Sequence, residues 1–205
     1  MEEIIEAYIK ENNKLTQRYN SWNHCYKAFN DLSKSDDELA LHLGFYLASW
    51  GMYRGSSKLL QKDYTVHLKM VEVIRSFQDL RCTREYEVSI RDRDRIIALI
   101  QATKVVYKSF NVSPTNTLVT KIILGTLGCL PAYDRFFIAG LKQCKEPFTT
   151  LSQTSLTKLL GYVEQHKQEL ESIKREKKLQ GYPLMKLVDM YFWQIGYEGG
   201  NIKKD

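Results

Sequence analysis

The chain has 205 residues, of which 43% are hydrophobic and 26% charged, with 11 glycines, 4 prolines and a net charge of +6. This composition excludes a disordered chain, a collagen-like repeat and a disulfide-stapled miniprotein, and the length favours one domain over residues 1–205. No apolar run reaches the roughly 18 residues that a membrane span needs, so we expect no membrane partner.

Helical periodicity dominates the chain, and we predict an all-α single domain of about eight or nine helices. Apolar residues at helical spacing mark helices over the ranges 4–9, 22–29, 39–53, 64–79, 93–110, 114–124, 131–141, 156–173 and 184–195. Three helix starts carry local signals, namely the capping box of Ser35 and Glu38, Ser113 as an N-cap before a proline, and Pro131. We expect a loose tail over 196–205.

The segment 39–53 is apolar nearly all round, which predicts a central buried helix. Gly44, Ala48, Gly51 and Gly55 repeat along it at helical spacing. Glycine costs roughly 1 kcal/mol against alanine inside a helix, so several glycines together need a reason. We interpret this face of small residues as a place where another backbone or a ligand approaches closely.

A second stripe on the same segment carries polar tips, at His42, Tyr46, Ser49 and Tyr53. Buried polar groups need hydrogen-bond partners, and two interpretations stay open. The stripe is either an internal hydrogen-bonded network, or the wall of a ligand cleft lined by His42, Tyr46 and Tyr53 with Arg54 at its rim.

Asp134 is a further candidate for this cleft. It is followed by Phe136-Phe137-Ile138, so its helix faces the core, and a carboxylate there needs a cationic partner. We expect Arg54 to be that partner, because its planar fork binds a carboxylate with two hydrogen bonds, and we expect His42 nearby. Both a structural ion pair and a ligand site fit this arrangement.

The second segment of interest is a predicted helical hairpin around 114–141. Its turn contains Gly125 and Gly128, with Lys121 before the turn and Arg135 after it. N–H groups at the start of the second helix are suited to bind a phosphate, with the two cations supplying charge. An ordinary hairpin with glycine as the C-cap is the alternative.

Two resemblances to known families rest on these segments. The runs 44–57 and 125–134 resemble segments of an uncharacterised family of small bacterial all-helical proteins. The run 121–134 is similar to the hairpin region of helix-hairpin-helix DNA-glycosylase-like proteins, which implies contact with nucleic acid. The chain departs from that pattern, because Gly125 and Gly128 are three residues apart and no cysteine cluster follows. The resemblance therefore does not extend to glycosylase chemistry.

Cysteine and histidine spacing gives no support for a metal site. The four cysteines lie far apart, at Cys25, Cys82, Cys129 and Cys144. No pair has the C-x-x-C spacing of zinc or redox motifs, and the four histidines are never paired at ligand spacing. No signal peptide is visible at the acidic start of the chain. We predict a cytoplasmic protein with free thiols and no metal or other cofactor.

The leading function hypothesis is a non-catalytic module that binds nucleic acid through the 121–135 hairpin and the basic C-terminal half. Residues 101–205 hold 15 basic and 9 acidic side chains, which gives the whole net charge. The alternatives are an enzyme or small-ligand protein that uses the His42, Tyr46, Tyr53 and Arg54 cleft, and a helical interaction domain with an unknown partner protein. No established catalytic motif is present, so the sequence leaves enzymatic activity open.

Overall fold

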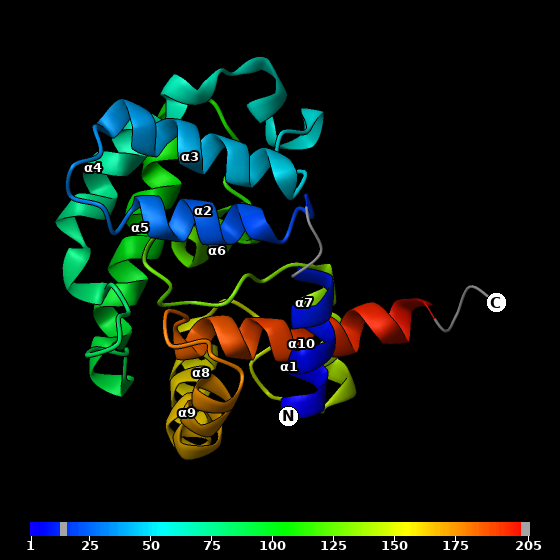
Figure 1. The fold of residues 1–205 in the computed structure, drawn as a ribbon. Helices are drawn as coiled ribbons and strands as arrows, with labels where there is room; N and C mark the ends of the chain where they lie inside the picture. Colours follow the sequence, from blue (N-terminus) through cyan, green and yellow to red (C-terminus); the bar gives the residue numbers. More distant parts are fainter. Residues whose placement is uncertain (13–15, 202–205) are drawn as a thin grey trace.

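The computed structural model of the protein describes residues 1–12 and 16–201, and every regular element within them is helical (Figure 1). The α-helices are α1 (Glu2–Asn12), α2 (Asn20–Ala28), α3 (Asp36–Ser49), α4 (Leu68–Ser76), α5 (Arg93–Ser109), α6 (Asn116–Thr126), α7 (Arg135–Gln143), α8 (Gln153–Gln165), α9 (Lys167–Glu176) and α10 (Leu184–Asn201). Short 3-10 turns are η1 (Gly55–Ser57), η2 (Leu59–Gln61), η3 (Tyr64–His67), η4 (Gln78–Leu80) and η5 (Ile90–Asp92). The predicted all-α class is confirmed. The long helix expected near the C-terminus is two helices, α8 and α9, which meet at His166.

The helices form two groups. Helix α3 packs against α2, α4 and α6, and α5 packs against α4 and α6. Helix α10 packs along α7 and also contacts α1, α8 and α9. In Figure 1 the first group lies above the second, and the chain passes from one to the other between α6 and α7. The described residues contain no helix with the length and apolar character to cross a membrane.

The passage between the groups is fully buried. Every residue from 118 to 134 is buried, although 127–134 is not helical. The carbonyl groups at the end of α6 and the start of the passage find partners from distant segments: Trp22 Nε1 donates to Leu124 O at 2.9 Å, Arg81 donates to Thr126 O, and Cys82 N donates to Leu127 O at 3.0 Å. Such partners are required, because an unpaired buried backbone group is costly.

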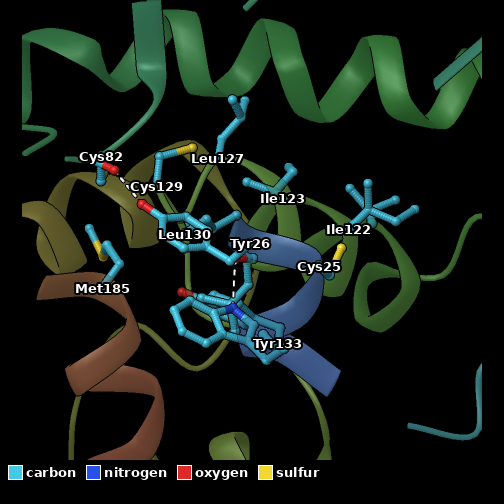
Figure 2. Close-up of a cluster of buried hydrophobic side chains, with 14 of the residues drawn as sticks. Cys25, Tyr26, Cys82, Ile122, Ile123, Leu127, Cys129, Leu130, Tyr133 and Met185 are labelled. Atoms are coloured by element: carbon cyan, nitrogen blue, oxygen red, sulfur yellow. Dashed lines mark hydrogen bonds between the residues drawn. The ribbon is translucent and has the colours of Figure 1, made fainter. Parts of the chain in front are cut away.

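Side chains from the first group also cover this passage. Figure 2 shows Tyr26 among Leu127, Cys129 and Leu130, with its hydroxyl donating to the carbonyl of Cys82. All of these residues are buried, and the cluster contains three free thiols, those of Cys25, Cys82 and Cys129. The core therefore centres on α6 and the passage that follows it.

Helix α3 differs from the expected 39–53 helix. The capping box is present, since Ser35 Oγ accepts from Glu38 N at 3.2 Å and Ser35 N donates to Glu38 Oε2 at 2.9 Å. The helix ends early because Gly51 has a φ of 66°, and the next N–H, of Met52, donates back to Leu47 O at 2.8 Å. This is a Schellman ending, which glycine favours. The helix is also not buried all round, because Phe45 is 64% exposed.

The predicted face of small residues is wrong. Gly44 does lie against η3, but Ala48, Gly51 and Gly55 are exposed. Gly51 serves the turn described above, and a side chain at Gly55 would meet nothing within 4 Å. Ala48 lies on the exposed side of the last turn of α3, and Gly51 and Gly55 follow the end of the helix at Ser49.

Close backbone approach through glycine occurs instead between α7 and α10. A methyl group on Gly140 would collide with the carbonyl of Phe192, and one on Gly196 would collide with the carbonyl of Phe136. Because this contact extends along α10, the helix continues to Asn201. The expected loose tail from residue 196 is therefore wrong up to that point, and residues 202–205 lie outside the described residues.

Candidate functional site

A hollow of about 300 Å³ opens where segments of both helix groups meet, and we call it the pocket. It is lined by Arg18, Trp50, Met52, Arg54, Thr117, Lys121, Asp134, Arg135, Phe136 and Trp193. These residues come from the α1–α2 connection, the chain after α3, helix α6, the start of α7 and helix α10. A smaller hollow of about 100 Å³ shares Met52, Arg54 and Thr117 with it and reaches Ser57 and Thr115.

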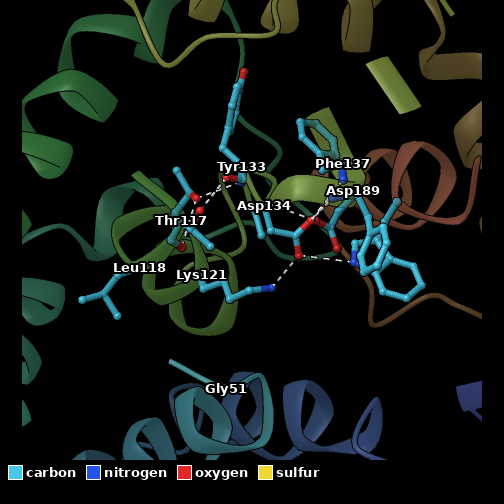
Figure 3. Close-up of polar contacts among 12 residues, drawn as sticks. Gly51, Thr117, Leu118, Lys121, Tyr133, Asp134, Phe137 and Asp189 are labelled. Carbon is cyan, nitrogen blue, oxygen red and sulfur yellow. Dashed lines mark hydrogen bonds and ion pairs between the residues drawn. The ribbon is translucent and has the colours of Figure 1, made fainter. Parts of the chain in front are cut away.

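An ion pair forms the floor of the pocket, and we call it the floor pair. Lys121 Nζ lies 3.0 Å from Asp134 Oδ2, with side chains 5% and 12% exposed (Figure 3). Trp193 Nε1 donates to the same oxygen at 3.2 Å. The other carboxylate oxygen accepts the backbone N–H groups of Phe136 and Phe137, each at 3.0 Å. Both oxygens of Asp134 are thus fully engaged.

This arrangement corrects two expectations from the sequence. Asp134 is the N-cap of α7, so the helix starts at Arg135 and not at Pro131. The carboxylate also takes the N–H groups that a phosphate was expected to bind at this helix start. The helix before it likewise begins later than expected, because Thr115 and not Ser113 is the N-cap of α6, accepting from Leu118 N at 3.2 Å.

The expected ion pair between Asp134 and Arg54 is wrong. Both residues line the pocket, but Asp134 pairs with Lys121, and the Arg54 Nε donates to the carbonyl of Gly51. Lys121 is the cation that pairs with Asp134 because it projects from α6 directly beside the start of α7. Arg54 instead follows the Gly51 turn and is exposed.

Three arginines surround the mouth of the pocket, and we call Arg18, Arg54 and Arg135 the rim arginines. All three are exposed, and among the described residues none pairs with a carboxylate. By contrast, Arg75 lies 2.6 Å from Asp36 and Arg95 lies 2.9 Å from Asp79. The pocket thus holds four cationic side chains and one carboxylate.

Aromatic rings lie beside these cations. The Arg18 guanidinium carbon is 5.1 Å from the Trp50 ring centroid, and Lys121 Nζ is 4.4 Å from it. The Arg135 guanidinium carbon is 4.4 Å from the Phe136 ring. Such contacts hold a cation without neutralising its charge. Within the described residues, Trp50 Nε1 is the one buried side-chain nitrogen or oxygen atom without a hydrogen-bond partner.

The predicted cleft of His42, Tyr46, Tyr53 and Arg54 is not assembled. Tyr46 is 2% exposed, and its ring fills the space beside Gly125. Burial raises the pKa of Tyr46 well above its usual value, so the phenol stays protonated. Of the four residues only Arg54 lines the pocket.

Tyr53 belongs to an internal hydrogen-bonded network, which was one of the two interpretations of the polar stripe. Its hydroxyl lies 2.8 Å from His67 Nε2, and the Tyr107 hydroxyl lies 2.7 Å from His67 Nδ1. Burial lowers the pKa of His67 to about 4 and raises that of Tyr53 to about 12. His67 is therefore neutral at neutral pH, with both ring nitrogens engaged.

His42 lies apart from this network. It lines a separate hollow of about 430 Å³ with His24, Glu38, Leu41 and Phe45. Burial, and then the charges of Lys34 and His24, lower the pKa of His42. The expectation that His42 lies near Asp134 finds no support, since the two line different hollows.

The two glycines of the predicted hairpin do not reach the pocket. A side chain on Gly125 would collide with the Tyr46 ring, and one on Gly128, whose φ is 70°, would collide with Pro183 and Tyr26. Of the four predicted nucleic-acid contacts, Lys121 and Arg135 line the pocket, while the glycines pack inside the core.

Sequence reasoning missed Arg18, Trp50 and Trp193. Arg18 lies outside any periodic pattern, and the two tryptophans belong to apolar segments in which a core role is the ordinary interpretation. The described residues contain no group of three or more histidine, cysteine or acidic side chains placed to hold a metal ion.

Comparison with known proteins gives no relative. No protein-family model matches the sequence, no curated protein matches it, and no solved structure matches the fold. The resemblances drawn from the sequence therefore stay predictions, and the site has to be interpreted from its own geometry.

Proposed function

We propose that this protein is a binding module for nucleic acid and that the pocket receives phosphate groups of the bound chain. One observation carries the proposal: the three rim arginines have no carboxylate partner in the described structure, and they surround a hollow whose single carboxylate is already neutralised by Lys121. Unpaired guanidinium groups gathered at one place repel each other and favour an anionic ligand.

Phosphate is the anion that suits these groups best. A guanidinium presents a planar fork of N–H donors that matches two phosphate oxygens. Asp134 does not oppose such a ligand, because both of its oxygens accept two hydrogen bonds each and its charge is compensated. The local field at the mouth is therefore set by the arginines.

The placement of the rim arginines on separate segments favours nucleic acid over an isolated anion. The rim arginines come from the α1–α2 connection, the chain before η1 and the start of α7, so they lie on three separate segments. The depression also continues into the smaller hollow next to Thr115, where α6 begins. An extended ligand with repeated phosphates uses this arrangement more fully than a single ion does.

The test is fluorescence anisotropy with a labelled oligonucleotide over a salt series. Arg18→Gln, Arg54→Gln and Arg135→Gln should each weaken binding and reduce the slope of log K against log salt by about 1. Arg75→Gln removes the same charge from an arginine already paired with Asp36, and it should leave the slope unchanged. Absence of binding at about 50 mM salt, or an Arg75→Gln effect equal to that of Arg18→Gln, would refute the proposal.

A small phosphate-bearing ligand is the second candidate, because a hollow of about 300 Å³ also has the size of a small-molecule site. The same assay separates the two by competition. A mononucleotide or inorganic phosphate that displaces the oligonucleotide at an equal concentration of phosphate groups supports the small ligand. Displacement only by the oligonucleotide supports nucleic acid.

A further inference from the structure

The inference concerns the strandedness of the nucleic acid and rests on the function proposed above. Its starting point is that the pocket is aromatic as well as cationic. Trp50 and Phe136 both line it, and both residues are only half-buried. Trp193 behind them is 2% exposed, and its N–H is bound to Asp134.

These rings are held by the surrounding packing. The centroids of Trp50 and Trp193 are 6.0 Å apart at 89°, and those of Phe136 and Trp193 are 5.2 Å apart at 69°. Trp193 thus supports both rings in edge-to-face contact, an arrangement that favours fixed ring positions. Rings held in place lose little conformational freedom when a ligand stacks on them.

A rim arginine lies over each of these two rings. Arg18 lies over Trp50, and Arg135 lies over Phe136. A nucleotide offers the matching pair of groups, since its phosphate suits a guanidinium and its planar base suits an aromatic ring. Proteins that bind single strands combine cationic grooves with aromatic stacking in this way.

The shape of the pocket separates single strands from duplexes. In a duplex the bases are stacked and paired inside, and the phosphates lie on a convex outer surface. A hollow of about 300 Å³ with rings in its wall cannot reach those bases. An unpaired strand can turn one base into the hollow while its backbone continues past Arg54 into the smaller hollow at Ser57 and Thr115.

We infer that the pocket takes one unpaired nucleotide of a single-stranded nucleic acid, with its base against Trp50 and Phe136 and its flanking phosphates on the rim arginines. The indole N–H of Trp50 is buried and takes no part in this contact. Lys121 Nζ lies 4.4 Å from the Trp50 ring centroid, and its charge is compensated by Asp134.

The first experiment compares three labelled ligands of equal length at one salt concentration: a single strand, the duplex of the same sequence, and an abasic strand with the same number of phosphates. The single strand should bind roughly 5- to 150-fold more tightly than the abasic strand, the range given by one base–aromatic stack. It should also bind more tightly than the duplex. Trp50 fluorescence should be quenched by the single strand, with Trp50→Phe as the control that loses the signal.

The second experiment uses Phe136→Leu and Trp50→Leu, with thermal unfolding to establish that each variant is folded. Both should weaken single-strand binding without changing the salt slope, whereas Arg18→Gln changes the slope. Equal binding of the abasic and normal strands, or of duplex and single strand, would overturn the inference and leave the proposed function standing. If none of the three ligands binds at low salt, the proposed function fails as well.

Discussion

Removing one charge of the floor pair at a time gives the sharpest test of the structure. In Asp134→Asn the side chain still offers an oxygen to cap α7, but Lys121 is left as a buried ammonium group facing an amide. Lys121 has no other hydrogen bond among the described residues. Loss of one partner from a buried ion pair typically costs about 3–5 kcal/mol, and we expect a loss of stability in this range.

The opposite variant should be less damaging. In Lys121→Met the Asp134 carboxylate keeps three N–H donors, from Phe136, Phe137 and Trp193. We expect a cost of about 1–3 kcal/mol, the range for weakening one buried polar contact. The double variant removes both charges, so it should be at least about 2 kcal/mol more stable than Asp134→Asn alone, a coupling typical of directly contacting residues.

Urea denaturation of the four proteins measures these differences, provided that the m-values agree. The expected order of decreasing stability begins with the wild type and ends with Asp134→Asn. Lys121→Met and the double variant lie between them, in either order. If the cost of the double variant equals the sum of the single costs, the two charges do not interact and the described floor pair is refuted.

Three further predictions concern stability. Because burial lowers the pKa of His67 to about 4 from an ordinary 6.5, the unfolded chain binds the extra proton first, so stability is fully present above pH 6.5 and is lost as the pH falls toward 4. Urea titrations should show a loss of about 2 kcal/mol between about pH 8 and pH 5, which His67→Gln should remove. Gly51→Ala, at a φ of 66°, should cost about 1–2 kcal/mol in thermal unfolding, while Gly55→Ala in open space should be nearly neutral; equal effects would contradict the turn. Gly196→Ala should cost about 1–3 kcal/mol or more through collision with α7, whereas Gly161→Ala, in a helix with free space, should stabilise by about 1 kcal/mol, and a tolerated Gly196→Ala would argue against the close α7–α10 contact.

The helices were predictable because their signals are local. Apolar periodicity located most of them, and the Ser35–Glu38 capping box lies within four consecutive residues. Helix ends were harder, since Asp134 and Pro131 compete as start signals, and the N–H groups of Phe136 and Phe137 that bind Asp134 select the later start.

The role of each glycine was not predictable from spacing. The same small residue serves a turn at Gly51 and close helix packing at Gly196, and only the neighbouring segment decides between them. The polar stripe on α3 was similarly ambiguous, because side chains that share a helix face can be directed to different neighbours. Tyr46 packs on Gly125, while Tyr53 binds His67.

The pocket was only partly predictable. Arg54, Lys121, Asp134 and Arg135 were singled out from the sequence as two separate candidate sites, and the structure brings them into one. Their partners on distant segments carry no local signal. A site whose walls come from five separate segments depends on tertiary packing, which periodicity does not describe.

The buried passage 127–134 has a consequence for how the pocket responds to a ligand. Loops between two groups of helices commonly act as hinges, because a few residues there absorb the change in backbone angles. Here any such rotation would break the bond from Ala132 N to Asp189, 3.0 Å long, and that from Tyr133 N to Thr120, 2.8 Å long, inside the core. The passage is therefore fixed against α6 and α10, which both line the pocket, before anything binds. We expect association without a slow closing step, so that the observed rate rises linearly with ligand concentration and shows no plateau.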